Sequence, residues 1–112
     1  MNLANRPPLG LKEPKANPDP AYLAKVRALP CIICVEFGLP QNSPTTAHHP
    51  IMGRYSNRKR PDCTAIPLCD GHHQGGVDTT KVAVHREPER WKRLYGKDTD
   101  WIAPTQDRLG TE

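Results

Sequence analysis

Apolar residues in this chain occur in short runs separated by prolines and glycines, a pattern that predicts short elements. Asp19 followed by Pro20 is typical of a helix N-cap with proline at the first helical position. A helix is therefore predicted over residues 20–28. Its buried side would consist of Tyr22, Leu23 and Val26. A second short amphipathic helix is predicted over residues 88–95, with Gly96 as its C-cap.

The middle of the chain predicts two strands and two turns. Residues 45–51 form the first predicted strand, and residues 63–68 form the second. Residues 29–38 read as a tight apolar turn bracketed by two cysteines. Residues 69–74 begin a helix or turn that a pair of glycines interrupts.

Length and composition predict one small domain with tails. The chain has 112 residues, of which 13 are proline and 8 are glycine, and 36% are hydrophobic. A core this small usually needs an additional stabilising crosslink, such as a bound metal or a disulfide. Residues 1–19 are expected to be a flexible, basic, proline-rich tail, residues 20–103 the domain, and residues 104–112 a loose C-terminal tail. The net charge of +4 fits a polyanionic partner.

The sequence also predicts a cytoplasmic protein without a membrane segment. No apolar run approaches the ~20 residues that span a bilayer. The N-terminus lacks the continuous apolar stretch of a signal peptide. Disulfides are rare in the cytosol, so cysteines with regular spacing are expected to bind a metal.

The cysteines provide one such spacing. Cys31 and Cys34 are separated by two residues, as are Cys69 and His72. Two such pairs predict a tetrahedral structural zinc site with three cysteines and one histidine. Cys63 is left out, because a strand at ~3.3 Å per residue puts it roughly 20 Å from Cys69. It is expected to be a small buried side chain. The alternative is a redox-active Cys-x-x-Cys pair.

The five histidines include two adjacent pairs, His48–His49 and His72–His73, followed by His85 after an apolar, β-branched run. Neighbouring side chains point to opposite faces of a strand and diverge by about 100° on a helix. One ion is therefore not expected to bind both members of a pair. His72 can complete the zinc site while His73 faces a second site, to which the run before His85 can deliver that residue.

The segments AHHPIMG, TAIPLCDGHH, AVH and WKRLYG, with a basic loop after the first, resemble the HNH nuclease superfamily. More closely, they resemble the phage recombination-enhancement (Ref) nucleases, over roughly residues 29–102. The resemblance implies an α+β fold: a small ββα-metal (HNH or His-Me finger) core with a structural zinc knuckle and short flanking helices.

The resemblance also implies a role for each motif residue. His49 matches the general base. The middle position of the motif, usually Asn, falls on Thr64, where it braces the hairpin, and Asp62 is expected to share that task. His85 follows a longer loop than the family pattern has. The residues implied to hold the catalytic ion are His48, His73 and His85.

The implied activity is metal-dependent hydrolysis of DNA backbone bonds, which leaves 5′-phosphate and 3′-hydroxyl ends. Mg²⁺, Mn²⁺ or Zn²⁺ would be the catalytic ion, next to the structural Zn²⁺. The implied partners are DNA and a recombinase filament, in the bacterial host cytoplasm if the protein is phage-encoded. The alternative is a non-catalytic, zinc-containing DNA-binding module, in which His49 would have no role as a base.

A basic loop lies between the two predicted strands. It is expected to contact phosphates without reading sequence, and the alternative is a solvated turn. Its proposed DNA-binding residues are Arg54, Arg58, Lys59 and Arg60.

Neutralising these four residues together should weaken DNA binding for every sequence. It should also flatten the salt dependence, because each lost phosphate contact removes about one released counterion. Affinities measured over a range of salt concentrations test this. An unchanged salt slope would remove the loop from the DNA-binding surface.

Overall fold

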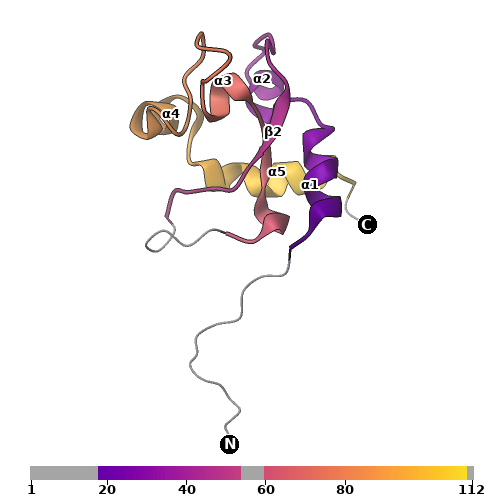
Figure 1. The fold of residues 1–112 in the computed structure, drawn as a ribbon. Coiled ribbons are helices and arrows are strands. Elements are labelled where there is room, and N and C mark those ends of the chain that lie inside the picture. Colours follow the sequence, from indigo (N-terminus) through magenta and orange to yellow (C-terminus); the bar gives the residue numbers. More distant parts are fainter. Residues whose placement is uncertain (1–17, 54–59, 111–112) are drawn as a thin grey trace, which may run out of the picture.

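A two-stranded antiparallel sheet lies at the centre of the protein, with short helices around it (Figure 1). The structure is a computed structural model that describes residues 18–53 and 60–110. Within these ranges the chain is a mixed α/β protein with five α-helices and two 3₁₀ helices. In chain order the elements are α1 (Pro20–Arg27), α2 (Ile32–Glu36), β2 (Thr45–His48), η1 (Asp62–Thr64), β3 (Ile66–Cys69), α3 (Asp70–His73), α4 (Pro88–Tyr95), η2 (Asp98–Trp101) and α5 (Ile102–Arg108).

The strands are shorter than the sequence predicts. β2 pairs with β3 so that Thr45 faces Cys69 and His48 faces Ile66. The predicted strand over 45–51 therefore ends three residues early, ahead of Pro50, which has no N–H to continue a ladder. Every residue of β3 is buried, so this strand lies within the core, whereas in β2 only His48 is fully buried.

The start of the second predicted strand, over 63–68, is wrong. In the structure this part is the 3₁₀ helix η1, in which Thr64 donates its N–H to the carbonyl of Pro61 at 3.0 Å. The helical turn directs Cys63 to the surface. The prediction that Cys63 is a small buried side chain is therefore also wrong.

The two helices predicted from capping patterns are present. Asp19 caps α1 by accepting a hydrogen bond from the N–H of Tyr22 at 3.1 Å. Within this helix Val26 is fully buried, whereas Tyr22 and Leu23 are half-buried. α4 ends at Gly96, whose φ of 89° is a backbone conformation that favours glycine.

The predicted apolar turn over residues 29–38 contains a helix instead. The N–H of Val35 donates to the carbonyl of Cys31, and that of Phe37 to the carbonyl of Ile33, both at 3.0 Å. The helix α2 buries Ile32 and Ile33 completely. One helical turn is compatible with the cysteine spacing because residues i and i+3 lie on the same face.

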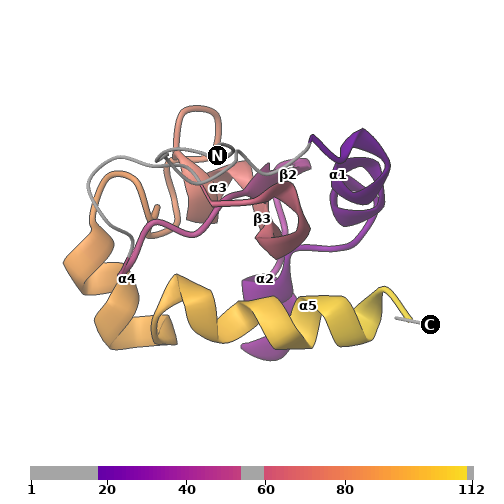
Figure 2. The ribbon, with the colours of Figure 1, turned by 90° about the horizontal axis from the view of Figure 1, so that it is seen from below.

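The C-terminal segment, predicted as a loose tail over residues 104–112, is helical as far as Arg108, and a turn follows at residues 109 and 110. In α5 the buried Thr105 donates its hydroxyl to the carbonyl of Trp101 at 2.8 Å. The guanidinium of Arg108 forms an ion pair with Glu36 of α2. Figure 2 shows α5 along one side of the molecule, next to α2. Residues 111 and 112 lie outside the described ranges.

The core is formed where the hairpin, α2 and α4 meet. Its largest fully buried apolar residues are Ile32, Ile33, Ile66, Leu68, Val84 and Trp91. Three of the four cysteines are part of the same cluster. No helix among the described residues is long and apolar enough to span a membrane.

Replacing Trp91 with alanine should lower the free energy of unfolding by about 3–5 kcal/mol, because the indole is fully buried and its loss leaves a cavity. Denaturant unfolding at fixed zinc concentration measures the change. Leu94 on the same helix is 48% exposed and supplies the control, since Leu94→Ala should change stability by no more than about 0.5 kcal/mol. Equal effects of the two substitutions would contradict this packing.

Candidate metal centres

Three thiols and one imidazole converge in the core. The Nδ1 atom of one histidine lies 3.4–3.6 Å from three sulfur atoms, two of which are 3.9 Å apart. A tetrahedral zinc ion, with bonds of ~2.3 Å to sulfur and ~2.0 Å to nitrogen, has edges of about 3.5–3.8 Å between its ligands. The spacing therefore fits a metal such as zinc. These four buried residues are Cys31, Cys34, Cys69 and His72.

Three elements of the fold, α2, β3 and α3, position these ligands. Cys31 is the N-cap of α2 and Cys34 lies one turn later on the same face. Cys69 ends β3, and His72 follows on α3. A metal held here would join α2 to the end of the hairpin and to α3. All the residues predicted for a structural zinc site are brought together in this cluster.

The charge state of the thiols also fits a cation. Hydrogen bonds from Cys31 and His72 lower the pKa of Cys69 to about 3. Sharing that hydrogen bond, together with burial, raises the pKa of Cys31, and burial together with the charge on Cys69 raises the pKa of Cys34 to about 11. Without a metal, one thiolate suppresses ionisation of its neighbours. A divalent cation would remove this repulsion and let all three thiols bind as thiolates.

A second cluster consists of three histidines whose ring centroids lie 5.0–5.2 Å apart. One ligand atom from each ring lies within 4.8 Å of the other two, so the cluster can hold a metal ion. The three rings differ in exposure: the first is buried, the second half-buried and the third exposed. Among the described residues, the cluster is therefore exposed to solvent at its third ring. We call these residues the histidine triad: His48 on β2, His73 on α3, and His85 in the loop before α4.

Backbone hydrogen bonds hold His85, the triad residue farthest along the sequence, next to His73. The N–H of Val84 donates to the carbonyl of His72 at 2.9 Å, and the N–H of His85 donates to that of His73 at 3.1 Å. Val84 is fully buried, so the apolar run anchors the segment in the core. The chain reverses after α3 through Gly75, whose φ is 71°.

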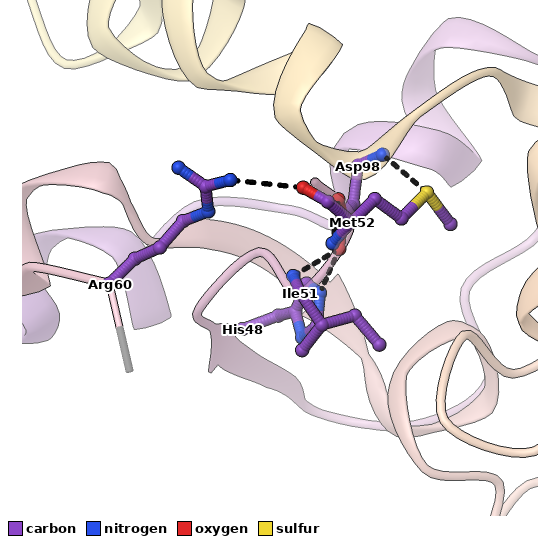
Figure 3. Close-up of polar contacts among 5 residues, drawn as sticks. All are labelled: His48, Ile51, Met52, Arg60 and Asp98. Atoms are coloured by element: carbon purple, nitrogen blue, oxygen red, sulfur yellow. Dashed lines mark hydrogen bonds and ion pairs between the residues drawn. The ribbon is translucent and has the colours of Figure 1, made fainter. Parts of the chain in front are cut away.

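A buried carboxylate determines which nitrogen of His48 is available. The Nε2–H of His48 donates to Oδ2 of Asp98 at 2.8 Å, and both side chains are fully buried. The Nδ1 atom is buried and has no hydrogen-bond partner among the described residues. Burial by itself would raise the pKa of Asp98, but hydrogen bonds from His48 and from the N–H groups of Ile51 and Met52 outweigh it and lower that pKa. Figure 3 shows these contacts.

A hydroxyl has the corresponding role at His73. Thr46 donates its hydroxyl hydrogen to the carbonyl of Leu68 at 2.8 Å, so its oxygen accepts from Nδ1–H of His73 at 2.7 Å. This leaves Nε2 of His73 for a metal. Burial, followed by the proximity of His48 and His85, lowers the pKa of His73 to about 4. The ring is therefore neutral at pH 7, as a metal ligand must be.

The remaining histidine has a separate partner. The Nε2–H of His49 donates to Oδ1 of Asp62 at 2.8 Å, and the two side chains are 17% and 13% exposed. The other oxygen of Asp62 accepts the N–H of Asp19 at 2.8 Å, which connects the pair to the start of α1. Thr64, the predicted brace of the hairpin, donates its hydroxyl to the nearby carbonyl of Pro61. The carboxylate of Asp62, rather than Thr64, makes the long-range contact.

The predicted DNA-binding loop is described only at its end. Arg60 donates from its guanidinium to the carbonyl of Met52 at 3.0 Å. Arg54, Arg58 and Lys59 lie outside the described residues. The DNA contacts of all four basic residues therefore stay predictions.

Two residues that hold the triad in place were not predicted from the sequence. Thr46 lies two positions before His48, so the alternation of side chains along a strand could have placed both on one face. Asp98 is 50 residues from His48 in the sequence, and no local pattern connects them.

No protein-family model, curated protein or solved structure matches this chain. Membership of a family is therefore still an expectation from the motifs.

The protein should contain one tightly bound zinc ion in the cysteine–histidine cluster. Removing it with a chelator should unfold the chain, because structural zinc contributes ~10 kcal/mol or more to small domains. Cys31→Ser and Cys69→Ser should lose this zinc. Cys63→Ser is the matched control, since Cys63 is exposed and outside the cluster, and should keep it. Elemental analysis of protein purified without added metal measures the content, and a zinc-free wild type would contradict the assignment.

Proposed function

We propose that this chain is a metal-dependent endonuclease of the HNH type that hydrolyses phosphodiester bonds of DNA. One observation carries the proposal: the histidine triad, which can hold an ion, is adjacent in the chain to His49, which is paired with the carboxylate of Asp62. A metal site next to an oriented, partly exposed imidazole has the parts required for hydrolysis of a phosphodiester.

In this proposal, His49 is the general base. Its Nε2–H is held by Asp62, which leaves Nδ1 as the atom that accepts a proton from the attacking water. A carboxylate behind a histidine fixes the tautomer and stabilises the imidazolium once it forms. The partial exposure of His49 and Asp62 allows water and substrate to reach the ring.

The histidine triad would hold the catalytic ion. Such an ion supplies a positive charge near the leaving 3′ oxygen and orients the phosphate. His48 and His73 would bind it through Nδ1 and Nε2 respectively, since their other nitrogens are engaged by Asp98 and Thr46. The exposed edge at His85 is the side from which a DNA phosphate would approach. Three nitrogen ligands favour Zn²⁺ over Mg²⁺, with Mn²⁺ intermediate.

The order of the elements is consistent with this proposal. Two strands, β2 and β3, are followed directly by α3, and these three elements contact one another. This is the order expected of a ββα-metal core. The cysteine–histidine cluster would then be the structural zinc site that keeps α3 at the end of the hairpin. The net charge of +4 and the basic loop support DNA as the substrate.

The motif resemblance extends the proposal to a recombinase filament as a partner in phage recombination, within the host cytoplasm. The rival proposal is a DNA-binding module in which both metals are structural. It leaves the pairing of His49 with Asp62 without a chemical purpose. A redox role for Cys31 and Cys34 is less well supported, because both sulfurs lie in a buried cluster with two further ligands.

His49→Ala should reduce DNA cleavage by ~10²–10⁴-fold, because the general base is lost. Zinc content and DNA affinity should stay near those of the wild type. Asp62→Asn should also slow cleavage, since the ring is no longer held in one tautomer. A nicking assay on plasmid DNA, with and without divalent metal and a recombinase filament, measures both.

The triad variants separate loss of the base from loss of the metal. His48→Ala and His73→Ala should also be inactive, but excess metal should partly restore them, whereas it should not restore His49→Ala. Normal cleavage by His49→Ala would refute its assignment as the base. A wild type that binds DNA but does not cut it under any of these conditions would favour the binding module.

A further inference from the structure

The carboxylate of Asp98 receives three hydrogen bonds from one short segment of chain. His48 and the N–H of Ile51 both donate to Oδ2 at 2.8 Å, and the N–H of Met52 donates to Oδ1 at 3.2 Å. Figure 3 shows these donors gathered around Asp98, with Arg60 bonded to the carbonyl of Met52. The acceptor comes from η2, far from the hairpin in sequence.

The donors lie on both sides of the residue proposed as the base. His48 precedes His49, and Ile51 and Met52 follow it. The backbone leaves β2 at this point, so no strand ladder holds it. Asp98 is fully buried, which strengthens these bonds relative to bonds exposed to water. A second contact runs the other way, since the N–H of Asp98 lies 3.3 Å from the sulfur of Met52.

We propose that Asp98 is a positioning residue that keeps His48 in the Nε2–H tautomer, with Nδ1 directed to a metal in the histidine triad, and holds the segment on either side of His49. The carboxylate acts through His48 and does not itself touch the ion. This inference rests on the metal site of the proposed function and does not depend on DNA cleavage.

The substitution Asp98→Asn tests the role because an amide has one acceptor atom where the carboxylate has two. If the amide oxygen takes the Oδ2 position, the N–H of Met52 loses its acceptor. If it takes the Oδ1 position, the amide NH₂ faces Nε2 of His48 and forces the proton onto Nδ1. The first arrangement keeps the bond from His48 but weakens it, because a neutral amide oxygen is a poorer acceptor than a carboxylate oxygen. The second arrangement breaks that bond, and in both the volume of the side chain hardly changes.

The expected result is a 10–100-fold weaker affinity of the triad for Zn²⁺ in Asp98→Asn, as is typical when the partner of a metal-binding histidine is removed. Calorimetric titration of Zn²⁺ into the full chain, with the cysteine–histidine cluster already filled, measures this affinity. Asp100→Asn is the matched control: it removes the same charge from the same element, and its oxygen still accepts the N–H of Lys97. Its Zn²⁺ affinity should equal that of the wild type.

A second measurement keeps the proposal testable if Asp98→Asn does not fold. Long-range proton–nitrogen NMR of the wild type with the triad metal-free should show the proton of His48 on Nε2. A proton on Nδ1, or unchanged Zn²⁺ affinity in a folded Asp98→Asn, would overturn the role of Asp98. A wild type that binds no second Zn²⁺ would overturn the triad itself. A wild type that binds it but does not cut DNA would overturn only the nuclease proposal.

Discussion

The cluster of three thiols and one imidazole is the constraint on which the rest of this structure depends. A two-stranded hairpin with four residues in each strand is at best marginally stable alone, and helices of four to eight residues are too short to form in isolation. The cluster connects α2, the end of β3 and α3 at a single point in the core. A metal held by these ligands would supply the stabilisation that so few apolar residues cannot provide.

The same cluster determines the position of the second site. His72 belongs to the cysteine–histidine cluster and His73 to the triad, so adjacent residues of one short helix connect the two centres. The two side chains diverge around the helix, which allows each to serve a different ion. The backbone bond from His85 to His73 then brings the third ligand to the triad. A change in the first centre is thus expected to disturb the second.

Each member of the His48–His49 pair has its own carboxylate. Asp98 accepts a hydrogen bond from the buried His48, and Asp62 accepts one from the partly exposed His49. The difference in burial matches the two proposed tasks. A metal ligand benefits from a rigid, dry environment, whereas a base that takes a proton from water needs access to solvent.

The sequence by itself determined the features that depend on local spacing. These are the caps of α1 and α4, the two-residue separations that bring together the four residues of the cysteine–histidine cluster, and the assignment of the two histidines of each adjacent pair to different sites. Only the tertiary structure decided the partners of those histidines, because Asp98 and Asp62 reach them across 50 and 13 residues. It also decided that Cys63 is exposed and that residues 102–108 form a helix. Periodicity and capping report interactions within a few residues, whereas these contacts arise only when distant segments pack together.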